Sequence, residues 1–130
     1  MAKEIKRVAV LGAGVMGQGI AAHLANAGID SVLFDMVPKG IAENAPVAER
    51  NAMAIAGIKG ALKAKPAALF CKEFADRITP ANYDDHGELL GDCDLIIEVV
   101  VERLDIKHHV FSWVAKHRKA GSILASNTSG

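Results

Sequence analysis

Three glycines near the start of the chain have the spacing of a phosphate-binding turn. The segment VAVLGAGVMGQG places Gly12, Gly14 and Gly17 in a G-x-G-x-x-G pattern directly after an apolar run. In this pattern the first glycine allows a tight turn, the second lets a phosphate approach the backbone, and the third lets the next helix pack closely. The amides that begin the helix attract a pyrophosphate. The predicted cofactor-binding residues of the turn are Gly12, Ala13, Gly14, Val15, Met16 and Gly17.

Asp35 is the residue expected to select the dinucleotide. It ends the segment SVLFD, 18 residues after Gly17. A carboxylate at this point accepts hydrogen bonds from the adenosine ribose and repels a 2′-phosphate, which favours NAD over NADP. Lys39 lies near enough that NADP is not excluded. The alternative is that Asp35 only caps a turn before Pro38.

The apolar pattern around these residues predicts the strands and the helix that position them. Residues 5–11 have the pattern of a buried strand, and residues 31–35 that of a second strand. Between them, residues 15–27 carry an apolar stripe at helical spacing, and Gly28 is a natural stop. Strand, turn, helix and strand form a βαβ unit, whose two strands are expected to be parallel.

The rest of the chain continues to alternate helices and strands. Residues 37–74 are rich in Ala and Lys and predict two or three helical pieces, separated by prolines. The later predicted elements are a short strand at 76–81, a short helix or turn at 84–91, the strongest strand at 94–101, a helix at 104–119 and a fifth strand at 122–125. We therefore predict one domain, residues 1–130, of α/β class. It is a Rossmann-type, doubly wound, mainly parallel sheet with a helical insertion after the second strand.

Composition argues against several other classes of protein. Lys plus Arg number 15 and Asp plus Glu number 15, so a zero net charge speaks against nucleic acid or an anionic membrane as main partner. No stretch is apolar enough to predict a membrane helix, and the N-terminus has no secretory h-region. Cys71 and Cys93 are far apart and match no CxxC spacing. We expect two reduced thiols, no metal site and a cytoplasmic location.

Three separated motifs resemble the NAD-binding domain of the L-3-hydroxyacyl-CoA dehydrogenases, particularly bacterial β-oxidation forms. They are VAVLGAGVMGQGIAAHLANAGI, DLIIEVVVERLDIK and SNTS, supported by KAKPAAL and RITPANYDD. The resemblance covers nearly the whole chain. It implies that the chain binds NAD within an enzyme that oxidises a 3-hydroxyacyl-CoA thioester to a 3-ketoacyl-CoA in fatty-acid β-oxidation.

The resemblance also implies roles for residues outside the glycine turn. Glu102 and Lys107 match residues beside the cofactor, although the residues alone equally suggest an exposed ion pair. Ser129 matches the residue where nicotinamide and substrate meet, and Asn127 belongs to the same loop. Lysines in the helical middle match a region that contacts the phosphates of coenzyme A, whereas lysine-rich helix faces are usually only solvated. These lysines are Lys59, Lys63 and Lys65.

Other ionisable residues have a structural interpretation. Glu98 lies inside an apolar strand, where a carboxylate is costly unless it has partners, so we interpret it as structural. Val99 is larger than the small residue that the family pattern has beside it. The histidines have no partner in a recognisable motif and are interpreted as surface or packing residues. They are His23, His86, His108, His109 and His117.

The resemblance places the catalytic histidine of the family downstream of the SNTS motif, in a His-Phe-Phe-Asn-Pro stretch that this chain does not contain. It implies an excised N-terminal domain, without the helical domain that completes the cleft and usually makes the homodimer. We expect cofactor binding with almost no turnover. Two alternatives stay open: another β-hydroxyacid dehydrogenase, and a nucleotide-sensing module without chemistry.

Overall fold

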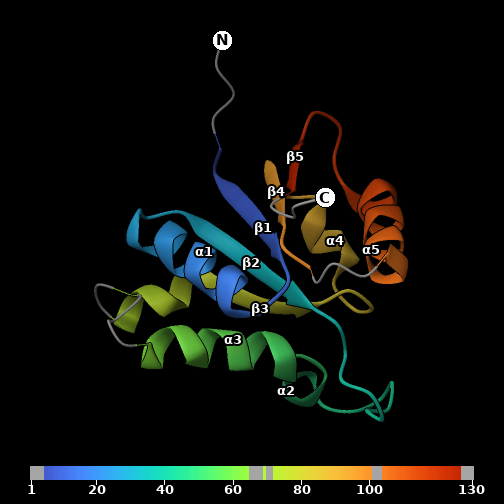
Figure 1. The fold of residues 1–130 in the computed structure, drawn as a ribbon, viewed down its shortest axis with the longest axis horizontal. Coiled ribbons are helices and arrows are strands. Elements are labelled where there is room, and N and C mark those ends of the chain that lie inside the picture. The colour runs from blue at the N-terminus through green and yellow to red at the C-terminus, as the bar shows by residue number, and fades with distance from the viewer. Residues whose placement is uncertain (1–4, 65–68, 70–71, 101–103, 127–130) are drawn as a thin grey trace.

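Five parallel strands form one sheet in a computed structural model that describes residues 5–64, 69, 72–100 and 104–126 (Figure 1). The strands are β1 (Arg7–Leu11), β2 (Asp30–Asp35), β3 (Ile78–Asn82), β4 (Leu95–Glu98) and β5 (Ile123–Ser126). Their order in the sheet is β3-β2-β1-β4-β5, and every pair is parallel. This is the Rossmann order, and its direction reverses between β1 and β4, where such sheets bind ligands.

Helices cover both faces of the sheet (Figure 1). The helical elements are α1 (Val15–Asn26), α2 (Val47–Arg50), α3 (Ala52–Lys63), the 3-10 helix η1 (Lys72–Arg77), α4 (Gly87–Leu90) and α5 (Leu104–His117). One core contains alanines of α1 and α3, and the other contains Val110 and Val114 of α5 with Leu90 of α4. The sheet therefore lies between an α1–α3 layer and an α4–α5 layer.

The sequence of β1 explains how it serves both layers. Val8 and Val10 belong to the core under α1, while Ala9 and Leu11 belong to the core under α5, because successive side chains of a strand point to opposite faces. All four side chains are fully buried. A central parallel strand thus has to be apolar throughout, as the sequence is.

The predicted α/β fold is confirmed, and the differences lie at the ends of elements. The insertion after β2 contains α2, α3 and the 3-10 helix η1, while Pro66, one of the prolines expected to separate the helical pieces, lies outside the described residues. Strand β4 ends at Glu98 rather than Val101. The Glu98 carboxylate accepts a hydrogen bond from the Val100 amide (3.1 Å), which turns the backbone out of the ladder.

A polar network that sequence patterns did not predict ties the insertion to the end of β3. The buried guanidinium of Arg50 donates to both oxygens of Asp85 (2.6 and 3.1 Å) and to the carbonyl of Ala42 (2.8 Å). The side-chain amide of Asn82 donates to the side-chain oxygen of Asn51 (2.7 Å) and to the carboxylate of Asp85 (3.1 Å). Hydrogen bonds from Arg50 hold the pKa of Asp85 below its usual value. The network fixes α2 and α3 beside the carboxyl end of the sheet.

Candidate functional site

Each glycine of the predicted turn has a different steric requirement. Gly12 has a φ of +117°, and a Cβ there would lie 3.0 Å from the carbonyl oxygen of Val99. A Cβ at Gly17 would lie 1.7 Å from the carbonyl oxygen of Gly12, so helix α1 approaches the end of β1 more closely than any side chain permits. A Cβ at Gly14 would meet nothing within 4 Å. Two glycines therefore form the turn, and the third leaves space open.

The beginning of α1 can accept an anion. Gly14 is its N-cap and makes no side-chain capping bond, and the first turn contains no acidic residue. The first amides of a helix lack partners within the helix, and the aligned peptide dipoles make this end positive. Since Gly14 also lines a cavity, the helix terminus is accessible to a phosphate there.

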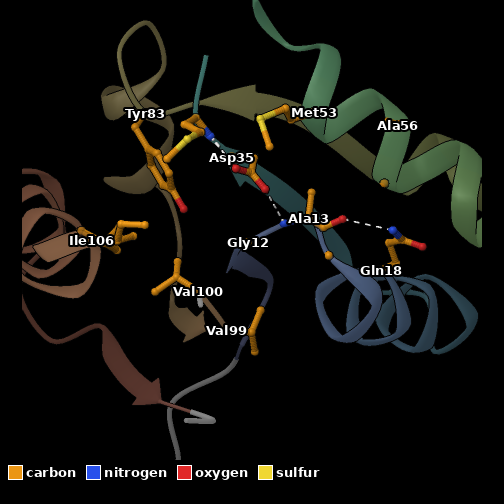
Figure 2. Close-up of a pocket in the computed structure, with 14 residues that line it drawn as sticks. Gly12, Ala13, Gln18, Asp35, Met53, Ala56, Tyr83, Val99, Val100 and Ile106 are labelled. Carbon is orange, nitrogen blue, oxygen red and sulfur yellow. Dashed lines mark hydrogen bonds between the residues drawn. The ribbon is translucent and has the colours of Figure 1, made fainter. Parts of the chain in front are cut away.

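Asp35 ends β2 and lies beside the glycine turn. Its Oδ2 accepts a hydrogen bond from the Ala13 amide (2.8 Å), and its Oδ1 accepts one from the Met36 amide (2.7 Å; Figure 2). A carboxylate has about four acceptor positions. Asp35 thus holds the turn in place and keeps acceptor capacity for a ligand in the cavity that it lines.

Helix α3 packs against the glycine turn through small residues. A Cβ at Gly57 would lie 3.0 Å from Cβ of Ala13, and a Cβ at Gly60 would lie 2.4 Å from Oε1 of Gln18. Gln18 in turn donates from Nε2 to the carbonyl of Ala13 (3.1 Å; Figure 2). Sequence reasoning missed these contacts. Gly57 and Gly60 lie three residues apart, a spacing that places both on one side of a helix.

A cavity of about 510 Å³ joins the turn to Asp35. This volume is in the range of small-molecule sites. The lining residues come from the ends of four strands and from α1, α3 and α5 (Figure 2): Gly12, Ala13, Gly14, Gln18, Asp35, Met36, Met53, Ala56, Gly57, Tyr83, Val99, Val100, Ile106 and Val110. The backbone of the glycine turn and the Asp35 carboxylate make one side of the cavity polar, while the other walls are largely apolar.

The apolar side of the cavity was not predicted from sequence. Val99 and Val100 follow β4, Met36 follows β2, and Ile106 and Val110 are one turn apart on α5. Ligands of open α/β sheets bind outside the carboxyl ends of the strands, so residues just after β2 and β4 were identifiable in principle. The larger Val99 belongs to this wall, where it faces Gly12.

A positive turn, a nearby carboxylate and an apolar compartment are the features of a dinucleotide site. Residues 7–130 match the family model of the 3-hydroxyacyl-CoA dehydrogenase NAD binding domain. The chain belongs to this family. Its ligand is therefore NAD, and the open space at Gly14 together with the accessible start of α1 fits a dinucleotide diphosphate.

Relatives and solved structures agree with this assignment. The chain is 47% identical over 139 residues to a probable 3-hydroxyacyl-CoA dehydrogenase of Bacillus subtilis, covering 100% of this chain and 18% of the relative. A protein of the same description from Deinococcus radiodurans is 44% identical, with coverage of 98% and 35%. The structure of 3-hydroxybutyryl-CoA dehydrogenase from Escherichia coli has a TM-score of 0.71 at 26% identity, with coverage of 98% and 25%. The chain thus spans about a third or less of these three proteins.

The other residues predicted for this 3-hydroxyacyl-CoA dehydrogenase domain lie in different places. Val15 and Met16 are exposed at the start of α1. Lys107 is half-buried on α5, and Lys59 and Lys63 are exposed on α3; these three do not line the cavity described above. Several predicted residues lie outside the described part of the chain: Lys65, Glu102, Asn127 and Ser129.

Glu98 is partnered, as its interpretation required. Its fully buried carboxylate accepts hydrogen bonds from the Val100 amide (3.1 Å) and the Ser126 hydroxyl (2.6 Å). The second bond joins the ends of β4 and β5, because Ser126 is the last residue of β5. Glu98 therefore acts as a structural carboxylate at the same edge of the sheet as the cavity.

The histidines and Cys93 also have structural surroundings. His86 accepts a hydrogen bond at its Nδ1 from the backbone amide of Asn82 (3.0 Å), and His117 lies against the ring of Trp113. His23, His108 and His109 are exposed. Cys93 is buried and free, and burial raises the pKa of its thiol to about 11, while Cys71 is outside the described residues. Within the described ranges, no cluster of potential metal ligands and no helix able to cross a membrane is found.

Proposed function

We propose that the chain forms the NAD side of an active site that oxidises a 3-hydroxyacyl-CoA to a 3-ketoacyl-CoA. The observation that carries the proposal is the glycine turn, open at Gly14, facing a cavity that Asp35 also lines. Bound NAD supplies the hydride acceptor for such an oxidation. The names of the relatives support the substrate class.

The chain's own residues orient the cofactor. The first amides of α1 bind the diphosphate, and the spare acceptor positions of Asp35 bind the adenosine ribose. The family resemblance supports further roles. Glu102 and Lys107 lie near the cofactor, and Ser129 holds the reacting substrate oxygen. Lys59, Lys63 and Lys65 contact the phosphates of coenzyme A.

The described wall of the cavity offers no histidine as proton acceptor for the substrate hydroxyl. None of the chain's histidines, all of which are described, is among the residues that line it. General-base catalysis typically contributes about 10²- to 10⁴-fold to a rate. We therefore propose that these 130 residues bind NAD with almost no turnover, and that a longer enzyme supplies the base.

Affinity for the two dinucleotides tests the role of Asp35. Calorimetry on the chain should show at least about tenfold tighter binding of NAD than of NADP, equivalent to 1.4 kcal/mol. Asp35→Ala should bring the ratio of the two affinities close to one. Asp30→Ala, at the exposed start of the same strand, is the matched control and should leave the ratio unchanged. A general loosening of the fold weakens the binding of both dinucleotides. The ratio of the NAD and NADP affinities therefore separates ribose recognition from an effect on stability. An unchanged ratio in Asp35→Ala would contradict the proposal.

Two alternatives make different predictions for a full-length enzyme. A dehydrogenase of free β-hydroxyacids would oxidise those acids and leave 3-hydroxybutyryl-CoA untouched. A nucleotide sensor would bind NAD and oxidise neither. The proposal requires NAD-dependent oxidation of 3-hydroxybutyryl-CoA. A homodimer of that enzyme and its cytoplasmic location stay predictions from the sequence.

A further inference from the structure

Tyr83 places a buried hydroxyl without a partner in the wall of the cavity. The residue follows β3 directly and is 9% exposed. Among the described residues, three buried side chains have a polar atom without a hydrogen bond: Arg7 Nε, Ser31 Oγ and Tyr83 Oη. Of these, Tyr83 is the one that lines the cavity. Buried tyrosine hydroxyls usually have a partner, so one that lacks it beside an open cavity points to a ligand.

Neighbouring aromatic rings hold Tyr83 in one orientation. Its ring stacks on Phe34 (centroids 6.0 Å apart) and meets Trp113 edge to face (4.9 Å). The Trp113 indole also donates to the backbone carbonyl of Tyr83 (2.8 Å). Figure 2 shows the hydroxyl turned towards the space between Asp35 and Val100. The hydroxyl is therefore positioned before any ligand enters.

The surroundings keep the hydroxyl neutral. Burial, and then the charges of Asp35 and Glu98, raise the pKa of Tyr83 well above its usual value. A neutral phenol both donates and accepts a hydrogen bond. It faces a compartment whose other walls include Met36, Ile106 and Val110. Apolar walls with one donor–acceptor group suit a flat heteroaromatic base.

We propose that the Tyr83 hydroxyl binds the amino-bearing edge of the adenine of NAD. This inference rests on the proposed function, in which Asp35 holds the ribose next to the base. The 6-amino group is the only donor of adenine and has a ring nitrogen acceptor beside it. At this edge a phenol hydroxyl, which both donates and accepts, finds an acceptor and a donor side by side. Tyr83 thereby becomes a residue that determines base specificity.

Two dinucleotides test the contact in the 130-residue chain. One is NAD, and the other is its 1,N6-etheno derivative, in which a two-carbon bridge ties the amino nitrogen to N1. Calorimetry should show that Tyr83→Phe weakens NAD binding by about 3- to 10-fold, the usual effect of one neutral hydrogen bond. The same substitution should weaken the binding of etheno-NAD by a smaller factor, because the bridge removes the N–H donor and the N1 acceptor of that edge.

A control variant separates the hydroxyl from packing. Trp113→Phe removes the indole bond to the Tyr83 carbonyl and leaves the hydroxyl in place, so it should change both affinities by the same factor. The melting temperature of ligand-free Tyr83→Phe should equal or exceed that of the unmodified chain, since the removed hydroxyl has no partner.

Several outcomes would overturn the inference. They are an unchanged NAD affinity in Tyr83→Phe, an equal loss for both dinucleotides, and a lowered melting temperature in that variant without ligand. Failure of the unmodified chain to bind NAD would instead refute the proposed function itself. Normal NAD binding that is insensitive to Tyr83→Phe would refute only the role of the hydroxyl.

Discussion

Two aspartates at opposite ends of the sheet show how similar local chemistry serves different purposes. Asp94 precedes β4 at the amino end, and Asp35 ends β2 at the carboxyl end. Each carboxylate accepts hydrogen bonds from two backbone amides. The difference lies in what else each one meets. Asp94 has a lysine as counter-ion, whereas Asp35 faces a cavity.

At the amino end, the groups around Asp94 satisfy one another. Its Oδ2 accepts from the amides of Lys6 (2.9 Å) and Arg7 (3.2 Å), and its Oδ1 forms an ion pair with Lys119. Its backbone joins the starts of β1 and β5, through bonds to the Arg7 carbonyl and from the Ile123 amide (2.9 Å each). Asp94 is therefore stabilised by partners within the protein.

At the carboxyl end of the sheet, backbone amides and the Asp35 carboxylate remain available to a ligand. The turn at Gly12 and Gly17 is as tight as the backbone allows, yet Gly14 and the start of α1 border free space. Asp35 is held by two amides and still has acceptor positions. The comparison teaches that the aspartate at the amino end finds its partners within the protein, whereas the aspartate at the carboxyl end keeps acceptor positions for a ligand.

Gly17→Ala should have the largest effect on stability, because it disrupts the packing of α1 against the carboxyl end of β1. The added Cβ would lie 1.7 Å from the Gly12 carbonyl oxygen, so the helix has to move away from β1. Overpacking costs about 1–3 kcal/mol and occasionally more. A clash with backbone belongs at the upper end, about 3 kcal/mol, and should lower the melting temperature by roughly 10 °C. Thermal unfolding followed by circular dichroism measures this.

Gly19→Ala is the matched control for this prediction. Gly19 lies on the same helix, and a Cβ there meets nothing within 4 Å. Alanine is favoured over glycine in a helix by about 0.5–1 kcal/mol, so this variant should be more stable than the unmodified chain. Equal stability of the two alanine variants would show that the close contact at Gly17 is not important.

Asp94→Asn should weaken the amino end in a pH-dependent manner. The Lys119 bond, followed by that from the Lys6 amide, lowers the pKa of Asp94 to about 2 from an ordinary value of 3.8. A lowered folded-state pKa stabilises the fold above about pH 4, and this contribution is lost as the pH falls towards 2. Asp94→Asn should therefore melt below the unmodified chain at pH 7, and the gap should narrow between pH 4 and pH 2.

Asp92→Asn controls for the loss of one negative charge. Asp92 is exposed and lies two residues before Asp94. Its substitution should leave the melting temperature nearly unchanged at every pH in the series. A gap that stays constant with pH in Asp94→Asn would mean that packing, and not the ionised carboxylate, supports the amino end.

The features predictable from sequence are those with a local signature. Glycine spacing, the continuous apolar strands and Asp35 at a strand end all depend on nearby residues, and they led to the Rossmann fold and to the glycine turn. The length of β4 depended on a side chain: Glu98 ends the strand by bonding to Val100. The pattern of apolar residues does not predict such a hydrogen bond.

The apolar side of the cavity depends on contacts between distant segments. Tyr83, Met36 and Ile106 come together only once β3 pairs with β2 and α5 packs on the sheet. The same is true of Arg50 and Asp85, which are 35 residues apart. Single side chains give no signal of such partners, so the sequence predicts the glycine-turn side of the cavity better than its apolar side.

Gly14→Ala should have the smallest effect on stability while removing the function of the carboxyl end. Its φ of −71° is accessible to alanine, and its Cβ would enter open space. Loss of a glycine N-cap should cost below about 1 kcal/mol. The methyl group would nevertheless occupy the place through which a phosphate approaches the amides of α1, so NAD affinity should fall by about tenfold or more. Calorimetry alongside thermal unfolding separates the two effects. A stable variant that binds NAD normally would show that the diphosphate does not pass over Gly14, and the contrast between the two ends of the sheet would lose its functional meaning.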